Sequence, residues 1–69
     1  MSEPPAVQAA RADVKHASHM LKLAREAYKT ANAGTDAEAA RGARRAVTHR
    51  LNKLGAAEDA LKRALKNNR

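Results

Sequence analysis

Apolar residues recur in the first half of the chain with a strict seven-residue period. One heptad position, a, always holds a larger apolar residue: Val7, Val14, Leu21 and Tyr28. The position three residues later, d, always holds alanine: Ala10, Ala17, Ala24 and Ala31. Such residues form one apolar stripe along a helix, which is typical of coiled coils. The first half therefore predicts one helix that packs through this stripe.

The second half of the chain repeats the heptad. Its a positions hold Ala40, Val47, Leu54 and Leu61, and its d positions hold Ala43, Arg50, Ala57 and Ala64. If the chain folds back on itself, a faces d, and large residues meet alanine in nearly every layer. These layers are Tyr28 on Ala43, Val47 on Ala24, Leu54 on Ala17, Val14 on Ala57, Leu61 on Ala10 and Val7 on Ala64. The pattern predicts an all-α fold, a two-helix antiparallel coiled-coil hairpin with an alanine-rich seam.

Local signals mark the ends of the two helices. Ser2 is a suitable N-cap, and Pro4 or Pro5 suits a first helical turn, where the missing amide hydrogen costs nothing. Gly34 is free to take a left-handed conformation that ends the first helix. We expect a single domain, 1–69, with helix 1 over about 4–32, a turn over 33–35 and helix 2 over about 36–66.

The turn contains a capping box. Thr35 is expected to cap the second helix, with Glu38 at its third position. Gly42 and Gly55 interrupt this helix, each at a cost of about 1 kcal/mol relative to alanine. Because the heptad keeps its register across Gly55, we predict one continuous helix. Acid–base pairs four residues apart, Glu58 with Lys62 and Asp59 with Arg63, support it.

Composition and charge limit what this hairpin can do alone. Eighteen of the apolar residues are alanine, and Tyr28 is the only aromatic residue. A core this small rarely supplies more than about 3–5 kcal/mol, and the chain has no cysteine to staple it. Association with itself or with a larger partner is therefore expected, and a monomer of low stability is the alternative. The net charge of +7 favours an anionic partner, whether nucleic acid or an acidic protein surface.

The cations gather on one side of the predicted hairpin, at heptad positions b and e. With Arg45 near the turn they form what we name the basic face: Arg11, Lys15, Lys22, Arg25, Lys29, Arg41, Arg44, Arg45 and Lys62, to which Arg69 adds near the C-terminus. Glu58 is the one acid at these positions. Arg25 and Arg44 should approach each other across the seam, where an anion would relieve their repulsion. A solvated face that keeps the hairpin soluble is the simpler interpretation.

The opposite side, at positions g and c, holds mostly small residues. We name it the small-residue face and assign it to self-association or to packing on a host protein: Met20, Leu23, Ala27, Ala39, Gly42, Ala46 and Ala60. Gly42 among alanines would let another backbone approach closely. Alternatively, the alanines serve helix propensity alone. Leu51 and Leu65, both at e, are also left uncovered by the seam.

Arg50 is the anomaly of the seam, because it faces Leu21. Its charge can extend outwards over Leu21, which is the favoured interpretation. Alternatively, it fixes the register or receives a carboxylate from a partner.

Few residues suggest chemistry. His16 and His19 have a spacing compatible with a metal ion, but no carboxylate or cysteine lies on the same face. The acids do not converge, and a two-helix hairpin has no cleft to desolvate them. We therefore expect no enzyme, no cofactor and no metal. We also expect no membrane partner, because no apolar run approaches the length of a membrane span. The N-terminal residues do not have the charged and then apolar pattern of a signal peptide.

Two functions fit these features. The first is a non-catalytic structural or assembly subunit, for example a component of a virion or another large particle, that uses both faces. The second is a small dimeric regulator that binds nucleic acid mainly through phosphates, with little sequence preference. A location in the cytoplasm, or inside a particle assembled in the cell, follows for either.

Overall fold

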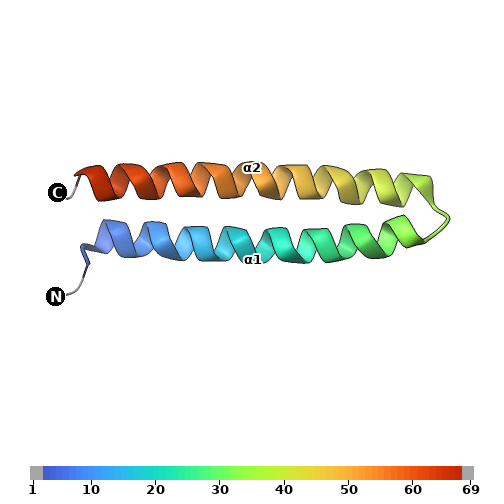
Figure 1. The fold of residues 1–69 in the computed structure, drawn as a ribbon, viewed down its shortest axis with the longest axis horizontal. Coiled ribbons are helices and arrows are strands. Elements are labelled where there is room, and N and C mark those ends of the chain that lie inside the picture. Colours follow the sequence, from blue (N-terminus) through green and yellow to red (C-terminus); the bar gives the residue numbers. More distant parts are fainter. Residues whose placement is uncertain (1–2, 68–69) are drawn as a thin grey trace.

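The chain forms a helical hairpin in a computed structural model that describes residues 3–67. Helix α1 runs over Pro5–Ala33 and helix α2 over Ala37–Asn67. The two lie side by side and antiparallel, with the start of α1 and the end of α2 at the same end of the hairpin (Figure 1). The hairpin measures 52 × 17 × 10 Å. The predicted all-α hairpin is confirmed.

Helix α1 begins without a side-chain cap. Pro4 occupies the N-cap position, and Pro5 is the first helical residue. The Pro4 carbonyl accepts the amides of Val7 and Gln8 at 3.0 and 3.1 Å. The proline is therefore used as predicted, since its fixed φ suits the first turn and its missing amide has no partner to lose. The proposed cap, Ser2, lies outside the described residues.

The turn differs from its prediction in two respects. Gly34 is extended, with φ −85° and ψ −177°, so the expected left-handed conformation is wrong. The cap of α2 is Asp36 rather than Thr35: its Oδ1 accepts the amides of Glu38 and Ala39 at 3.0 and 3.2 Å. The helix starts one residue later than expected, at Ala37, and a carboxylate at this site also complements the helix dipole.

Burial follows the heptad closely. Val7, Ala10 and Leu21 are buried, and every other a and d position of both helices is half-buried. Among residues 3–67, only Met20 and Gly55 lie outside these positions and are not fully exposed. This agreement confirms the predicted seam as the line of contact between the helices. The helix also continues through Gly55, as predicted.

The hairpin is thin and exposes much of its surface. Its accessible area is 5548 Å², whereas a compact monomer of 7.4 kDa exposes about 4200 Å². Its radius of gyration is 15.7 Å, against about 11 Å for a compact domain of this length. The two helices contact each other only along the seam, where large residues meet alanine. Both sides of the seam are therefore uncovered, and no further helix packs on either of them within residues 3–67.

Leu21→Ala tests how far stability depends on the seam. Leu21 is 5% exposed, so we expect this substitution to cost about 2–4 kcal/mol and to leave much of the protein unfolded. Leu23→Ala is the matched control, because Leu23 is 44% exposed and should lose less than about 0.5 kcal/mol. Urea unfolding followed by circular dichroism at low protein concentration measures both. Equal losses of stability in the two variants would contradict the assignment of Leu21 to the seam.

Asp36→Ala tests the corrected cap. Removing the carboxylate leaves the amides of Glu38 and Ala39 without their acceptor, and we expect a loss of about 1 kcal/mol. Thr35→Ala should change stability by less than about 0.5 kcal/mol. Thermal unfolding of the two variants decides between the caps, and a larger effect at Thr35 would restore the capping box.

Candidate partner-binding surfaces

All nine residues of the basic face within the described chain are exposed. They occupy b and e positions of both helices, with Arg45 at f, so the helical repeat brings them to one side of the seam. Arg69 lies outside the described residues. The surface that the sequence predicts is therefore available to a partner over most of the hairpin's length.

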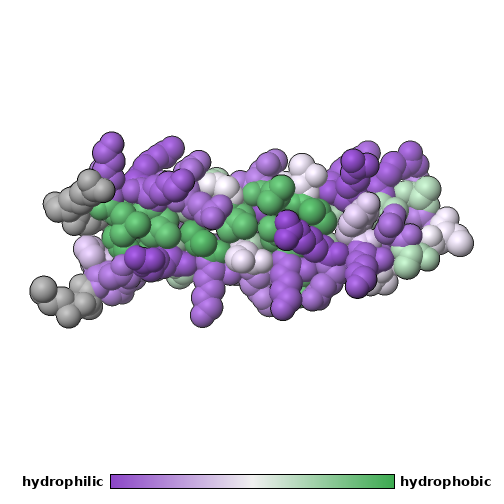
Figure 2. All heavy atoms as spheres, in the orientation of Figure 1, coloured by the Kyte–Doolittle hydropathy of each residue, from purple (hydrophilic) through white to green (hydrophobic). Residues whose placement is uncertain are grey.

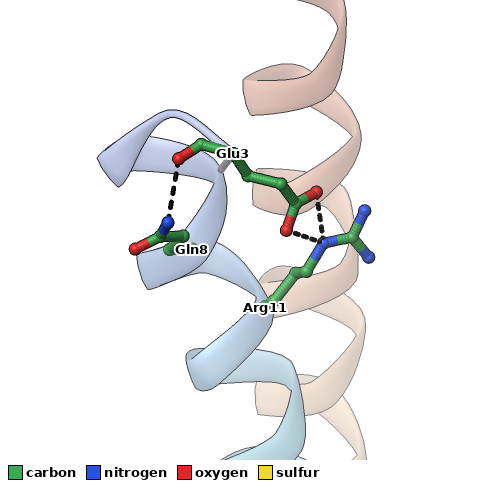
Figure 3. A network of polar contacts seen from close by, with 3 residues as sticks. All are labelled: Glu3, Gln8 and Arg11. Atoms are coloured by element: carbon green, nitrogen blue, oxygen red, sulfur yellow. Dashed lines mark hydrogen bonds and ion pairs between the residues drawn. The ribbon is translucent and has the colours of Figure 1, made fainter. Parts of the chain in front are cut away.

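Arg11 differs from the other cations because it already has an anionic partner. Its Nε lies 2.8 Å from both carboxylate oxygens of Glu3. Gln8 Nε2 donates to the Glu3 carbonyl at 2.9 Å, which holds the segment before α1 against the helix (Figure 3). No pattern in the sequence predicts this contact, because Glu3 precedes the helix and has no place in the heptad. Arg11 therefore contributes less positive charge than its neighbours.

The remaining cations keep their charge uncompensated. Between residues 3 and 67, Glu3–Arg11 is the one ion pair. The expected pairs of Glu58 with Lys62 and of Asp59 with Arg63 are not formed. Exposed side chains lose conformational entropy when they pair, so such contacts contribute little. The basic face thus presents an unneutralised field to solvent.

Part of the basic face borders an apolar groove. Leu21, Leu51 and Leu54 come from the two helices and line a hollow of about 460 Å³. We name it the leucine groove. Its border along α1 holds three cations, Lys22, Arg25 and Lys29, together with Ser18 and one acid, Glu26. Leu51 is 48% exposed, so this groove combines accessible apolar surface with three cations.

A second hollow lies nearer the turn. Arg41, Arg44, Arg45 and Thr48 line a volume of about 290 Å³, which we name the arginine hollow. Arg41 and Arg45 also line a neighbouring hollow of about 420 Å³ with Glu38 and Gly42. Guanidinium groups in such a cluster suit phosphate or carboxylate oxygens. Arg25 lines the leucine groove and Arg44 the arginine hollow, so their direct approach stays a prediction.

The small-residue face is open over its whole length. Six of its seven residues are exposed, and Met20 is half-buried. A β-carbon added at Gly42 would meet nothing within 4 Å, so space for a second backbone is present there. Leu23 is the large apolar residue that this face leaves uncovered, at 44% exposure.

Figure 2 shows how the apolar and polar surfaces alternate on one broad side of the hairpin. Away from the turn, a band of apolar atoms follows the line between the helices, with hydrophilic side chains projecting on either side of it. The band is visible because the thin seam does not enclose it. Apolar surface rimmed by polar groups is typical of sites that bind another protein.

Within residues 3–67, no three His, Cys, Asp or Glu side chains gather where a metal ion could be held. Charged residues interrupt both α1 and α2, and neither carries an apolar stretch sufficient to cross a bilayer.

Arg50 is half-buried in the seam, where it faces the buried Leu21 in the predicted layers. Arg50→Leu should raise the free energy of unfolding by about 1 kcal/mol, because an apolar side chain fills the layer without holding a charge near it. Arg63→Leu, on the exposed side of α2, is the control and should change it by less than about 0.5 kcal/mol. Urea unfolding measures both, and destabilisation by Arg50→Leu would favour a role in fixing the register.

Comparison of the chain with models of protein families, with curated proteins and with solved structures gives no match. Function is therefore inferred from the burial, the geometry and the charge of the two faces.

Proposed function

We propose that the protein is a non-catalytic structural or assembly subunit. It packs on a second copy or on a host protein through the small-residue face, and it meets an anionic partner through the basic face. A component of a virion or of another particle assembled in the cell is one setting that would use both faces.

The observation that carries this proposal is the excess of exposed surface. The hairpin leaves roughly 1300 Å² more area in contact with water than a compact monomer of its mass. This additional exposed area is larger than the roughly 800 Å² that each partner buries in a standard protein interface. A second layer of packing would supply the stability that three buried side chains cannot.

The small-residue face suits the first of these contacts. Alanine and glycine let two helices approach closely, and close approach increases the van der Waals contact along their length. The face carries few large side chains, so little side-chain entropy is lost when it is covered. Exposed Leu23 and half-buried Met20 would fill the space between copies or against a host.

The basic face suits the second contact. Its uncompensated cations would raise the rate of encounter with an acidic surface and favour it over a basic one. The same cations oppose association of two copies through this face. The two contacts therefore use separate faces.

A nucleic-acid-binding regulator is the second candidate, and the arginine hollow favours it. Arg41, Arg44 and Arg45 line this hollow, and their guanidinium groups could bind backbone phosphates. A dimer formed through the small-residue face would present two such clusters. Tyr28 is half-buried in the seam, so no aromatic platform for bases is present within residues 3–67.

The mass of the purified protein in solution tests the assembly proposal. We expect at least twice the monomer mass of 7.4 kDa at high concentration. Gly42→Gln should weaken this association by about tenfold, because the longer side chain keeps the backbones apart. Gly55→Gln is the matched control: it removes the same helix-breaking residue, where an added β-carbon also meets nothing within 4 Å, and should leave association unchanged.

The other outcomes separate the candidates. A monomer at all concentrations that also fails to bind host protein would contradict the assembly subunit. The nucleic-acid-binding regulator would be supported instead if the affinity for RNA falls about tenfold or more between low and moderate salt. The double variant Arg25→Glu with Arg44→Glu should then lose RNA binding while its mass in solution stays unchanged.

A further inference from the structure

The leucine groove presents one leucine, Leu51, and three cations that the seam does not use. Leu51 lies at an e position, outside the stripe that joins the helices, and yet 48% of its surface is exposed beside Leu21 and Leu54. Two antiparallel helices leave a furrow on each side of their line of contact. A third helix laid in such a furrow packs on both, as in a helical bundle.

We propose that the leucine groove binds an acidic amphipathic helix of a partner protein. The inference rests on the proposed function, because it specifies the anionic partner of the basic face. Leucine-sized side chains of the partner would pack on exposed Leu51 and half-buried Leu54, and its carboxylates would meet Lys22, Arg25 and Lys29.

The spacing of the cations fits a helical occupant. Lys22, Arg25 and Lys29 are three and four residues apart on α1, so they form one row along its exposed side. This row is about 10 Å long, which is two turns of a helix. A partner helix that lies along it would place acids at matching intervals beside one apolar stripe, the arrangement of helix-in-groove recognition.

Charge excludes a second copy as the natural occupant. The chain has a net charge of +7, and pairing two basic faces would bring cation against cation. Nucleic acid fits the groove poorly, because its leucine floor offers no partner to phosphate and the only aromatic side chain lies in the seam. An acidic amphipathic helix can cover the leucines and pair with the three cations, provided that its carboxylates lie away from Glu26, the one acid of the border.

Binding of a designed peptide tests the proposal. The probe is a labelled peptide of about three heptads with leucine at a and d and glutamate at the positions beside them. Its control replaces the leucines with alanine, which keeps the charge and the helix propensity. We expect the full-length protein to bind the leucine peptide at least about tenfold more tightly than the alanine peptide, measured by fluorescence anisotropy.

Variants of the groove locate the binding. Leu51→Ser should weaken it at least about tenfold, while Leu23→Ser, which alters a leucine of similar exposure on the other face, should change it less than about twofold. The triple variant Lys22→Glu, Arg25→Glu and Lys29→Glu should also lose binding, and Lys53→Glu, Arg63→Glu and Lys66→Glu should retain it. Circular dichroism confirms that each variant folds.

Several results would contradict the proposal that the groove binds an acidic helix. These are equal affinity for the two peptides, no effect of Leu51→Ser, tighter binding of an RNA of equal length than of the leucine peptide, or a dimer that Leu51→Ser dissociates. If the alanine peptide or RNA binds, and this binding requires the cations but not Leu51, the proposed role of the groove is wrong. The proposal of an anionic partner for the basic face is then still supported. If no anionic probe binds, both fail.

Discussion

Packing of large side chains against alanine along a single seam is the interaction on which the molecule depends. Alanine opposite a larger residue lets two helices approach to the short end of the usual range of about 8–10 Å. The same alanines bury little area, so among residues 3–67 only Val7, Ala10 and Leu21 are fully buried, and the other seam residues are half-buried. The hairpin therefore gains a defined register but only a shallow core, and its stability is sensitive to each seam position.

A shallow core leaves two exposed flanks with different chemistry. One side carries alanine and glycine, where backbones can approach. The other carries uncovered leucines beside cations, where a helix with acids and apolar residues would find both kinds of contact. A single pair of helices could not cover either flank, since each helix already uses its apolar stripe for the seam. Most of the cations lie apart from the small residues, and this makes two distinct interfaces physically compatible.

Electrostatics reinforces this separation. Glu3 compensates Arg11, and no other ion pair forms over residues 3–67. The acids Asp36 and Glu38 lie at the turn, where Asp36 is used to cap α2. The positive charge of the basic face is therefore not neutralised within the chain. It repels another copy in the same orientation, and it attracts carboxylate or phosphate groups of a different molecule.

The sequence by itself determined which side chains share each face of each helix, because the helical repeat is local. Every a and d residue was found in the seam, and the continuous α2 followed from the unbroken register at Gly55. The start of α2 was predicted less accurately, because Thr35 and Asp36 are adjacent residues that can both cap a helix. Which of them does so depends on the path of the chain between the two helices. An extended Gly34 follows from the same path.

Only the tertiary structure decided what lies beside what across the two helices. Leu51 was recognisable as uncovered, but its place with Leu21 and Leu54 depends on the rotation and register of one helix against the other. The contact of Glu3 with Arg11 depends on how the segment before α1 folds back. Such contacts join residues that no helical period relates, so a repeat can predict the faces of a helix but not the grooves between two.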